Sequence, residues 1–267
     1  MEENKLVLPA IAVRGIVPLP NNEFRIEVGR ENSVLALDAA EKMYGGNVLL
    51  LIQKDANKVE VEPTDIEPIG VLAKITLKLK LPNKNYKVKF KIADRISVLE
   101  YTSLDPYFVC AYEKLHSVLN GDDLETALIK KVSNAITTAG INILANPDEV
   151  SKLLTKDVNP AVLSDVIAYN LKTSGKIANK YRYLECLDVS MRLQYILDDI
   201  EHEKAIVEIE NKINKDVKKS IDESQKEYYL REKMKAIQNE LGDKARQEED
   251  VEKLRKALDE AKLPANI

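Results

Sequence analysis

The residues suited to thiol, imidazole or soft-metal chemistry are two cysteines and two histidines: Cys110, Cys186, His116 and His202. The first cysteine and the first histidine are close in sequence, but the second pair is too far apart for the ligand spacings of a zinc site. Each cysteine stands among apolar residues, a setting typical of a buried, reduced thiol. We therefore expect no metal site.

Motifs for nucleotide binding and hydrolysis are incomplete. A phosphate loop needs Gly, four residues, then Gly-Lys-Ser/Thr, because backbone amides must wrap the phosphates. The Gly175-Lys176 pair has Asn170 in place of the first glycine and Ile177 in place of the Ser/Thr. Neither Gly-x-Ser-x-Gly nor His-Glu-x-x-His occurs. Carboxylate pairs are common, but on charged helices they usually form solvated faces. We expect no catalytic residue and no cofactor in this chain.

Composition narrows the class of protein further. The 267 residues are 45% hydrophobic and carry a formal charge of −4. This is enough apolar material for a core and for two domains, and any contact with nucleic acid or an anionic membrane would need a local patch. The apolar run Val48 to Ile52 is far shorter than the roughly 18 residues that suggest a membrane span. The Met1 to Lys5 start lacks the features of a secretory signal, so we predict a cytoplasmic protein with no membrane partner.

The first 115 residues are predicted to form strands. One helix interrupts them at Ser33 to Met43, with Ser33 as its cap. Several strands with a single helix suggest a small closed or half-closed barrel. The predicted strands are Leu6 to Val13, Phe24 to Val28, Val48 to Gln53, Val71 to Leu81, Tyr86 to Ile92 and Phe108 to Leu115.

The hairpin from Lys74 to Ile92 alternates apolar residues with lysines. Period two predicts that all its apolar side chains share one face and that five lysines share the other. Such a basic face could hold phosphates or acidic segments, or it could be a solvated outer face that keeps the sheet soluble. We favour the solvated face, because no arginine or aromatic residue is available there to grip or stack bases.

Helical periodicity begins at Asp122. Asp122 and Asp123 can cap a first helix that Gly140 closes, and Asn146-Pro147 and Asn159-Pro160 open two more. Thr173-Ser174-Gly175 then breaks the chain, and these helices predict a compact bundle.

After Asn179 no proline or glycine occurs before Gly242. Residues 201–267 hold 15 basic and 17 acidic groups, so about half of them are charged. A long helix is predicted, followed by a second charged helix with Val251, Leu254 and Leu258. The apolar positions Leu230, Met234, Ile237 and Leu241 are spaced 4-3-4 as in a coiled coil. Spacing alone leaves two alternatives: a helix hairpin within one chain, or a stalk that pairs with other subunits or joins another domain.

The stretch Ser224 to Asp243, SQKEYYLREKMKAIQNELGD, resembles the long helix in the N-terminal region of Lon, the ATP-dependent bacterial protease. Val13-Arg14-Gly15-Ile16-Val17-Pro18-Leu19-Pro20 and Val28 to Ser33 resemble the opening strands and first helix of the same region. Ile69 to Ile75 and Lys80 to Asn83 resemble its central hairpin. Leu19-Pro20-Asn21-Asn22 departs from the Pro-Gly-Met pattern of the family, and Ala178 to Leu187 matches less well.

The resemblance implies an α+β fold with four parts. These are a β-rich pseudo-barrel head at 1–116, a helical bundle at 117–178, a long helix at 179–243 with coiled-coil character, and a charged helical linker at 244–267. It also implies a homohexamer in which ATP and Mg²⁺ drive unfolded or degron-bearing proteins toward a Ser-Lys peptidase. The family's Walker residues and catalytic dyad have no counterpart here, so we expect a fragment that ends, at Leu263 to Ile267, before the ATPase module.

Capture of unfolded proteins calls for apolar, adaptable contacts. The candidate substrate-binding residues are Ile16, Val17, Pro18, Leu19 and Pro20, and, on the long helix, Tyr228, Tyr229 and Met234. The loop could equally close one end of the barrel. For the two tyrosines we favour packing in a helix core over contact with substrate. Two other function classes remain open: a stand-alone PUA-like module that binds protein or, weakly, DNA, and a purely structural coiled coil.

Overall fold

The head is a six-stranded sheet that closes on itself. In the computed structural model, which describes residues 6–156, 158–172 and 178–260, the strands are β1 (Leu6–Val13), β2 (Glu23–Val28), β3 (Asn47–Ile52), β4 (Ile69–Lys80), β5 (Tyr86–Ser103) and β6 (Phe108–Leu115). Their order is β2-β5-β4-β3-β1-β6, and a further pairing of β5 with β6 closes the barrel. The predicted pseudo-barrel and all six strands are confirmed, although β5 is longer than expected.

One long strand allows this closure. The first half of β5 pairs with β2 and β4, and its second half pairs with β6 from Arg95↔Leu115 to Ser103↔Val109. Two register shifts in the β5–β6 ladder bend the strand, as bulges do. Both faces of β3 are buried, because Val48 and Leu50 belong to one core cluster and Leu49 and Leu51 to another.

Helix α1 (Glu31–Met43) begins earlier than predicted. Arg30 is at its N-cap position with no side-chain cap, and Ser33 is a buried residue of the first turn. The cap assigned to Ser33 is therefore wrong. The helix can start earlier because the carbonyl of Arg30 already accepts from the N–H of Val34 at 2.9 Å.

Four helices follow the head and form the bundle: α2 (Asp122–Ala139), α3 (Pro147–Leu154), α4 (Pro160–Asn170) and α5 (Ala178–Glu185). A short 3₁₀ turn at Ile141–Ile143 belongs to the bundle, and another at Pro63–Asp65 lies in the head between β3 and β4. The caps at Asn146 and Asn159 are confirmed, since each side chain accepts from a first-turn N–H. Gly121 takes the N-cap position of α2, which places Asp122 and Asp123 in the first turn. The predicted break at Thr173 to Gly175 lies outside the described residues.

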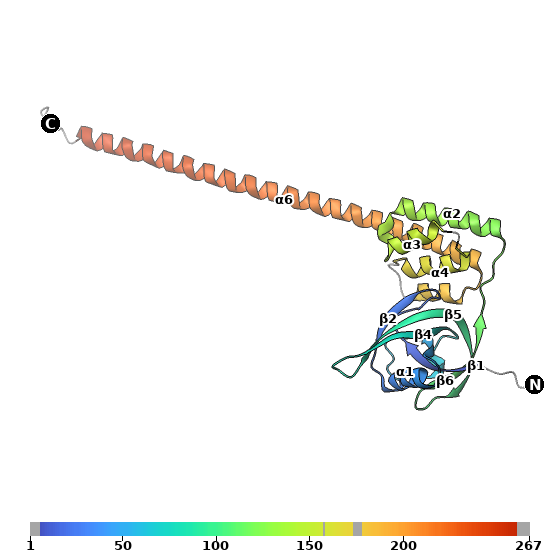
Figure 1. The fold of residues 1–267 in the computed structure, drawn as a ribbon. Helices are drawn as coiled ribbons and strands as arrows, with labels where there is room; N and C mark the ends of the chain where they lie inside the picture. Colours follow the sequence, from blue (N-terminus) through green and yellow to red (C-terminus); the bar gives the residue numbers. More distant parts are fainter. Residues whose placement is uncertain (1–5, 157, 173–177, 261–267) are drawn as a thin grey trace, which may run out of the picture. The chain divides into compact units, whose positions relative to one another are not determined.

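Helix α6 (Val189–Glu260) has 72 residues and corrects two predictions about the long helix. It starts at Val189, because Asp188 caps it by accepting from the N–H of Met191 at 2.9 Å. It also runs through Gly242 without a break, so Val251, Leu254 and Leu258 belong to the same helix. Figure 1 shows α6 as one continuous helix. The chain divides into two compact units, Met1–Ala205 and Ile206–Ile267. The predicted end at Leu263 to Ile267 lies outside the described residues.

One hydrophobic core joins head and bundle within the first unit. The larger cluster contains Leu19 and Phe90 from the head, Leu163 from α4, and Leu193 and Ile196 from the start of α6. In the described part of the chain, no helix is long and apolar enough to cross a membrane. Both cysteines are free thiols, with Cys110 buried and Cys186 only half-buried, so the expectation of burial is confirmed for Cys110 alone.

Candidate functional site

The candidate loop Ile16 to Pro20 lies mostly inside the first unit. Val17 and Leu19 belong to the core, both prolines are buried, and Ile16 is the exposed member, at 38%. Asn22 fixes the loop, because its side-chain amide donates to the carbonyl of Pro20 at 2.8 Å and to that of Asp165 in α4 at 3.4 Å. Burial in the first unit therefore accounts for four of the five side chains, and Ile16 is the exposed one.

The candidates on the long helix are open to solvent. Tyr228, Tyr229 and Met234 are 68%, 63% and 62% exposed, and they lie in the second unit. Other apolar residues of this unit are equally exposed, among them Ile209, Ile213, Val217, Ile221, Leu230, Ile237 and Leu241. A helix with this many uncovered apolar side chains has the composition of a docking face.

The hairpin of β4 and β5 differs from the prediction. A register shift between Ile75 and Leu77 inserts one residue, so the side chains beyond it change faces. Leu77 and Leu79 are consequently 45% and 50% exposed, whereas Lys78 is half-buried. The prediction that all apolar side chains share one face is wrong for this end of the hairpin. We call Leu77 and Leu79 the hairpin patch.

Two lysines of the hairpin are already paired with carboxylates. The ammonium of Lys78 lies 2.5 Å from Asp38 and 2.7 Å from Glu41, both on α1. Burial by itself would lower the pKa of Lys78, but its hydrogen bonds to the two carboxylates raise that pKa overall. The ammonium of Lys89 lies 2.6 Å from Glu23 on β2. These pairs offset part of the positive charge that a phosphate backbone would need.

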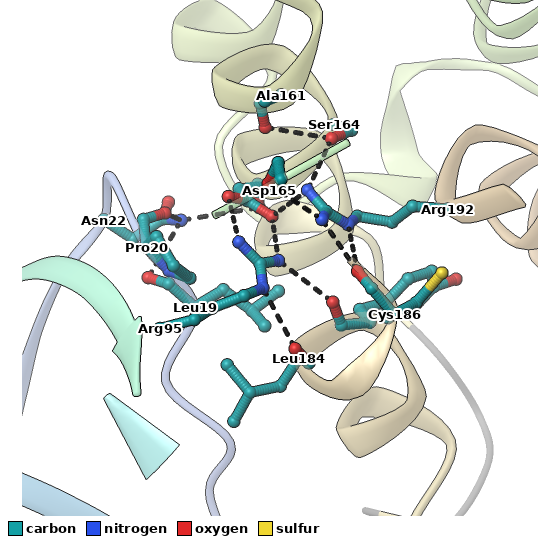
Figure 2. A network of polar contacts seen from close by, with 12 residues as sticks. Leu19, Pro20, Asn22, Arg95, Ala161, Ser164, Asp165, Leu184, Cys186 and Arg192 are labelled. Carbon is teal, nitrogen blue, oxygen red and sulfur yellow. Dashed lines mark hydrogen bonds and ion pairs between the residues drawn. The ribbon is translucent and has the colours of Figure 1, made fainter. Parts of the chain in front are cut away.

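A buried network of two arginines and one aspartate joins the head to the bundle. Figure 2 shows Arg95 of β5, Asp165 of α4 and Arg192 of α6 converging at one point. Arg95 donates to both carboxylate oxygens of Asp165, at 2.5 and 2.8 Å, and Arg192 donates to one of them at 2.8 Å. The three side chains are at most 3% exposed. We call these three residues the arginine–aspartate network.

Backbone carbonyls and the hydroxyls of Ser117 and Ser164 accept further hydrogen bonds from the two arginines. Arg95 donates to the carbonyls of Tyr183 and Leu184, and Arg192 donates to that of Cys186 at 2.7 Å. The arginines thus hold the end of α5 and the turn before α6, which contains neither glycine nor proline. Burial lowers the pKa of Arg192 to about 10, although the charge of Asp165 opposes this shift. Arg192 therefore stays protonated at neutral pH, and the network positions the bundle on the head.

The sequence reasoning missed this network. Its signal was only partial: apolar residues directly follow Arg95, Asp165 and Arg192, but polar residues also stand close to each of them. Charged residues are almost never fully buried unless paired. A charged residue at a core position therefore indicates a buried partner of opposite charge, but the sequence does not identify that partner.

Comparison with known proteins gives one consistent result. Residues 7–202 match the family model described as "ATP-dependent protease La (LON) substrate-binding domain". The chain is 38% identical to a Lon protease of Aster yellows witches'-broom phytoplasma over 97% of its own length and 33% of the relative. Toward Lon protease 1 of Bacillus subtilis it is 32% identical, over all of its own length and 34% of the relative.

The solved structures agree with this result at the level of the fold. The N-terminal domain of a Lon protease from the Mycobacterium avium complex matches with a TM-score of 0.58 at 18% identity, over 73% of this chain and 98% of that domain. The chain therefore spans about one third of the length of the curated relatives that it matches.

Proposed function

This chain belongs to the Lon substrate-binding domain family, and on that basis we propose that it captures unfolded or degron-bearing polypeptides for an ATP-dependent serine protease. The observation that carries the proposal is the family match over residues 7–202. It spans both the head and the bundle, which share one hydrophobic core. A capture region of this kind holds a polypeptide but does not cleave it.

Ile16 and the hairpin patch are the proposed contacts on the head. An unfolded polypeptide differs from a folded one in showing apolar side chains, so its receptor needs uncovered apolar surface. Ile16 and the hairpin patch provide such surface on the head. Tyr228, Tyr229 and Met234 provide more on α6, where the flexible thioether of Met234 can adapt to different sequences.

The catalytic steps would belong to other parts of a longer protein. ATP with Mg²⁺ would drive transfer, and a Ser-Lys dyad would hydrolyse peptide bonds. The described residues do not fit a nucleotide site, because none of their loops has the phosphate-loop sequence, and Gly175-Lys176 lies outside them. We assign no catalytic step to this chain, and we place the protein in the cytoplasm.

Binding of an unfolded protein by the 267-residue chain tests the proposal. The probe is a disulfide-bonded protein that carries a fluorescent label and is kept unfolded by reduction and carboxymethylation. Its folded form, with the same label, is the comparison. We expect the chain to bind the unfolded form. We expect L77D/L79D to weaken binding about thirtyfold, since each leucine contributes about 1 kcal/mol of apolar contact and the two together contribute about 2 kcal/mol. The matched control is L104D/L119D, which changes two other exposed leucines. Equal affinity for the folded and unfolded forms would refute the proposal.

A deletion in the intact protease tests the same proposal in its working context. Removing residues 1–115 should impair degradation of an unfolded protein far more than hydrolysis of a short peptide. The short peptide needs no capture, so its hydrolysis serves as the internal control. Equal loss of both activities would contradict a role in capture.

The exposed stripe on α6 supports a second proposal, that this helix contributes to assembly of a homohexamer. Ile209, Ile213 and Val217 follow each other at four-residue spacing and are each more than half exposed. Burial of such a stripe against other helices would stabilise an oligomer. Light scattering at several protein concentrations measures the mass, and I213E should lower it. An unchanged monomer mass for both proteins would refute assembly through this helix.

DNA binding through the hairpin lysines remains a weaker alternative. A titration with duplex and single-stranded DNA at two salt concentrations tests it, because phosphate contacts weaken steeply with salt. Binding near background at both concentrations would dismiss it.

A further inference from the structure

Among the described strands of the head, one has a free edge. Each of β1, β3, β4, β5 and β6 has at least two neighbouring strands, but β2 pairs with β5 alone in the described sheet. Strand β1 is also open over part of its length. It pairs with β6 only from Leu6 to Ala10, so from Ile11 to Val13 its described partner is β3. An unpaired strand edge exposes a row of amide and carbonyl groups.

These two open edges border the same cavity. A cavity of ≈ 690 Å³ has Ile11–Arg14 of β1 and the following turn on one wall and Arg25–Gly29 of β2 and its end on the other. Ile16, Arg30, Ser33 and Asn85 complete its lining. We call this cavity the slot. A second cavity of ≈ 610 Å³ shares Ala12, Arg30 and Ser33 with it, so the hollow extends further along β1.

The walls of the slot combine an apolar floor with cationic edges. Ile16 and Ile26 form the accessible part of the floor, and the nearly buried Ile11, Val13 and Val28 complete its apolar lining. Arg14 and Arg25 are exposed, and no hydrogen bond or ion pair joins either guanidinium to another described residue, although the charge of Arg25 does attract the carboxylate of Glu23. Burial and the nearby charge of Arg14 both lower the pKa of Arg30.

The slot therefore carries excess positive charge. Its lining holds three arginines and one carboxylate, Glu27. The carboxylate of Glu27 already accepts from the side-chain amides of Asn83 and Asn85, at 3.0 and 2.6 Å. Unpaired guanidiniums beside an apolar floor suit carboxylates, which accept from arginine in a bidentate geometry.

We propose that the slot binds an extended peptide segment with alternating apolar and acidic residues, which adds as a strand to the free edge of β2. Apolar side chains on one face of the segment would cover the floor, and carboxylates on the other face would meet Arg14 and Arg25. Backbone hydrogen bonds give such a contact affinity for any extended chain, and the arginines select acidic ones. This inference rests on the proposed function and names the class of substrate that the head prefers.

The test uses a fluorescein-labelled ten-residue peptide of alternating Val and Glu, titrated into the 267-residue chain at low salt. We expect it to bind at least ten times more tightly than the same peptide with Lys in place of Glu, and we expect added salt to reduce the difference. A third peptide carries N-methyl groups on alternate residues, which remove the N–H donors along one edge. It should bind at least ten times more weakly, and equal affinity would overturn strand addition.

Two variants locate the site. R14E/R25E should weaken binding of the acidic peptide at least tenfold, and R14Q/R25Q should weaken it less, because it removes charge without reversing it. The matched control is K131E/K152E, which makes the same change in charge on two exposed lysines of the bundle and should leave affinity within about twofold. Far-ultraviolet circular dichroism checks that each variant is folded. If R14E/R25E binds as tightly as K131E/K152E, the slot is not the site.

Failure of this inference can be told apart from failure of the proposed function. If the chain binds the unfolded protein but does not prefer the acidic peptide, the slot proposal is wrong and the capture proposal stands. If the chain binds neither, both are wrong.

Discussion

Replacing Asp165 with asparagine should destabilise the first unit more than any surface substitution of the same kind. The carboxylate accepts three hydrogen bonds from two buried guanidiniums, and its side chain is 2% exposed. Asparagine is nearly isosteric, but it is neutral and one of its two terminal atoms is a donor. That donor would face an arginine, and two positive charges would remain buried without a counterion.

The magnitude follows from the burial of the network. Removing one partner of a buried ion pair costs roughly 3–5 kcal/mol, because an uncompensated charge stays in the interior. For a unit of this size, each kcal/mol lowers the melting temperature by about 2–4 °C. D165N should therefore lower the melting temperature of the first unit by about 6–20 °C.

Near-ultraviolet circular dichroism is the appropriate assay, because the chain has no tryptophan and the buried tyrosines Tyr181 and Tyr183 belong to the first unit. The matched control is D38N, which removes a carboxylate paired with Lys78 at a site where Asp38 is 39% exposed and Glu41 remains. A surface pair contributes about 0–1 kcal/mol. If D165N lowers the melting temperature no more than D38N does, the network does not hold the bundle on the head.

Four further predictions concern Cys110 and Asp188. Burial raises the pKa of Cys110 to about 12, so its thiolate fraction at pH 8 should be about a thousandfold below that of an exposed cysteine. Alkylation by iodoacetamide should therefore modify Cys186 first. Because this pKa is raised, Cys110 contributes stability below pH 9, and that contribution should be lost as the pH rises toward 12. In C110A, stability should therefore fall less steeply over this alkaline range. An unchanged alkaline slope in C110A would contradict the prediction. D188A should cost about 1 kcal/mol through loss of the α6 cap, measured by urea denaturation, with D198A as the control on an exposed turn of the same helix. The hydrogen bond from Asn120 lowers the pKa of Asp188, so the stability that Asp188 contributes is present above the ordinary aspartate pKa and is lost as the pH falls. D188N should therefore make the free energy of unfolding fall less steeply at acid pH. An unaltered fall would exclude Asp188 as its source.

Much of the fold could be predicted from local pattern. The strands Leu6–Val13 and Phe108–Leu115 and the caps at Asn146 and Asn159 depend on nearest neighbours along the chain, and these predictions are confirmed. The start of α6 was missed because helix propensity remains high across residues 179–189. The break there depends on Asp188 as a cap and on Arg192, which binds the carbonyl of Cys186.

The sequence by itself determined the order of the parts, the family, and the residues with apolar surface to offer. Only the tertiary structure decided which of them are uncovered: it buried Val17 and Leu19, exposed Leu77 and Leu79 through one inserted residue, and left β2 with a free edge. It also brought together Asp165 with Arg95 and Arg192, two arginines that are 97 positions apart in the sequence. The physical reason is that propensity and periodicity act over a few residues, whereas exposure, strand partners and counterions depend on which distant segments pack together.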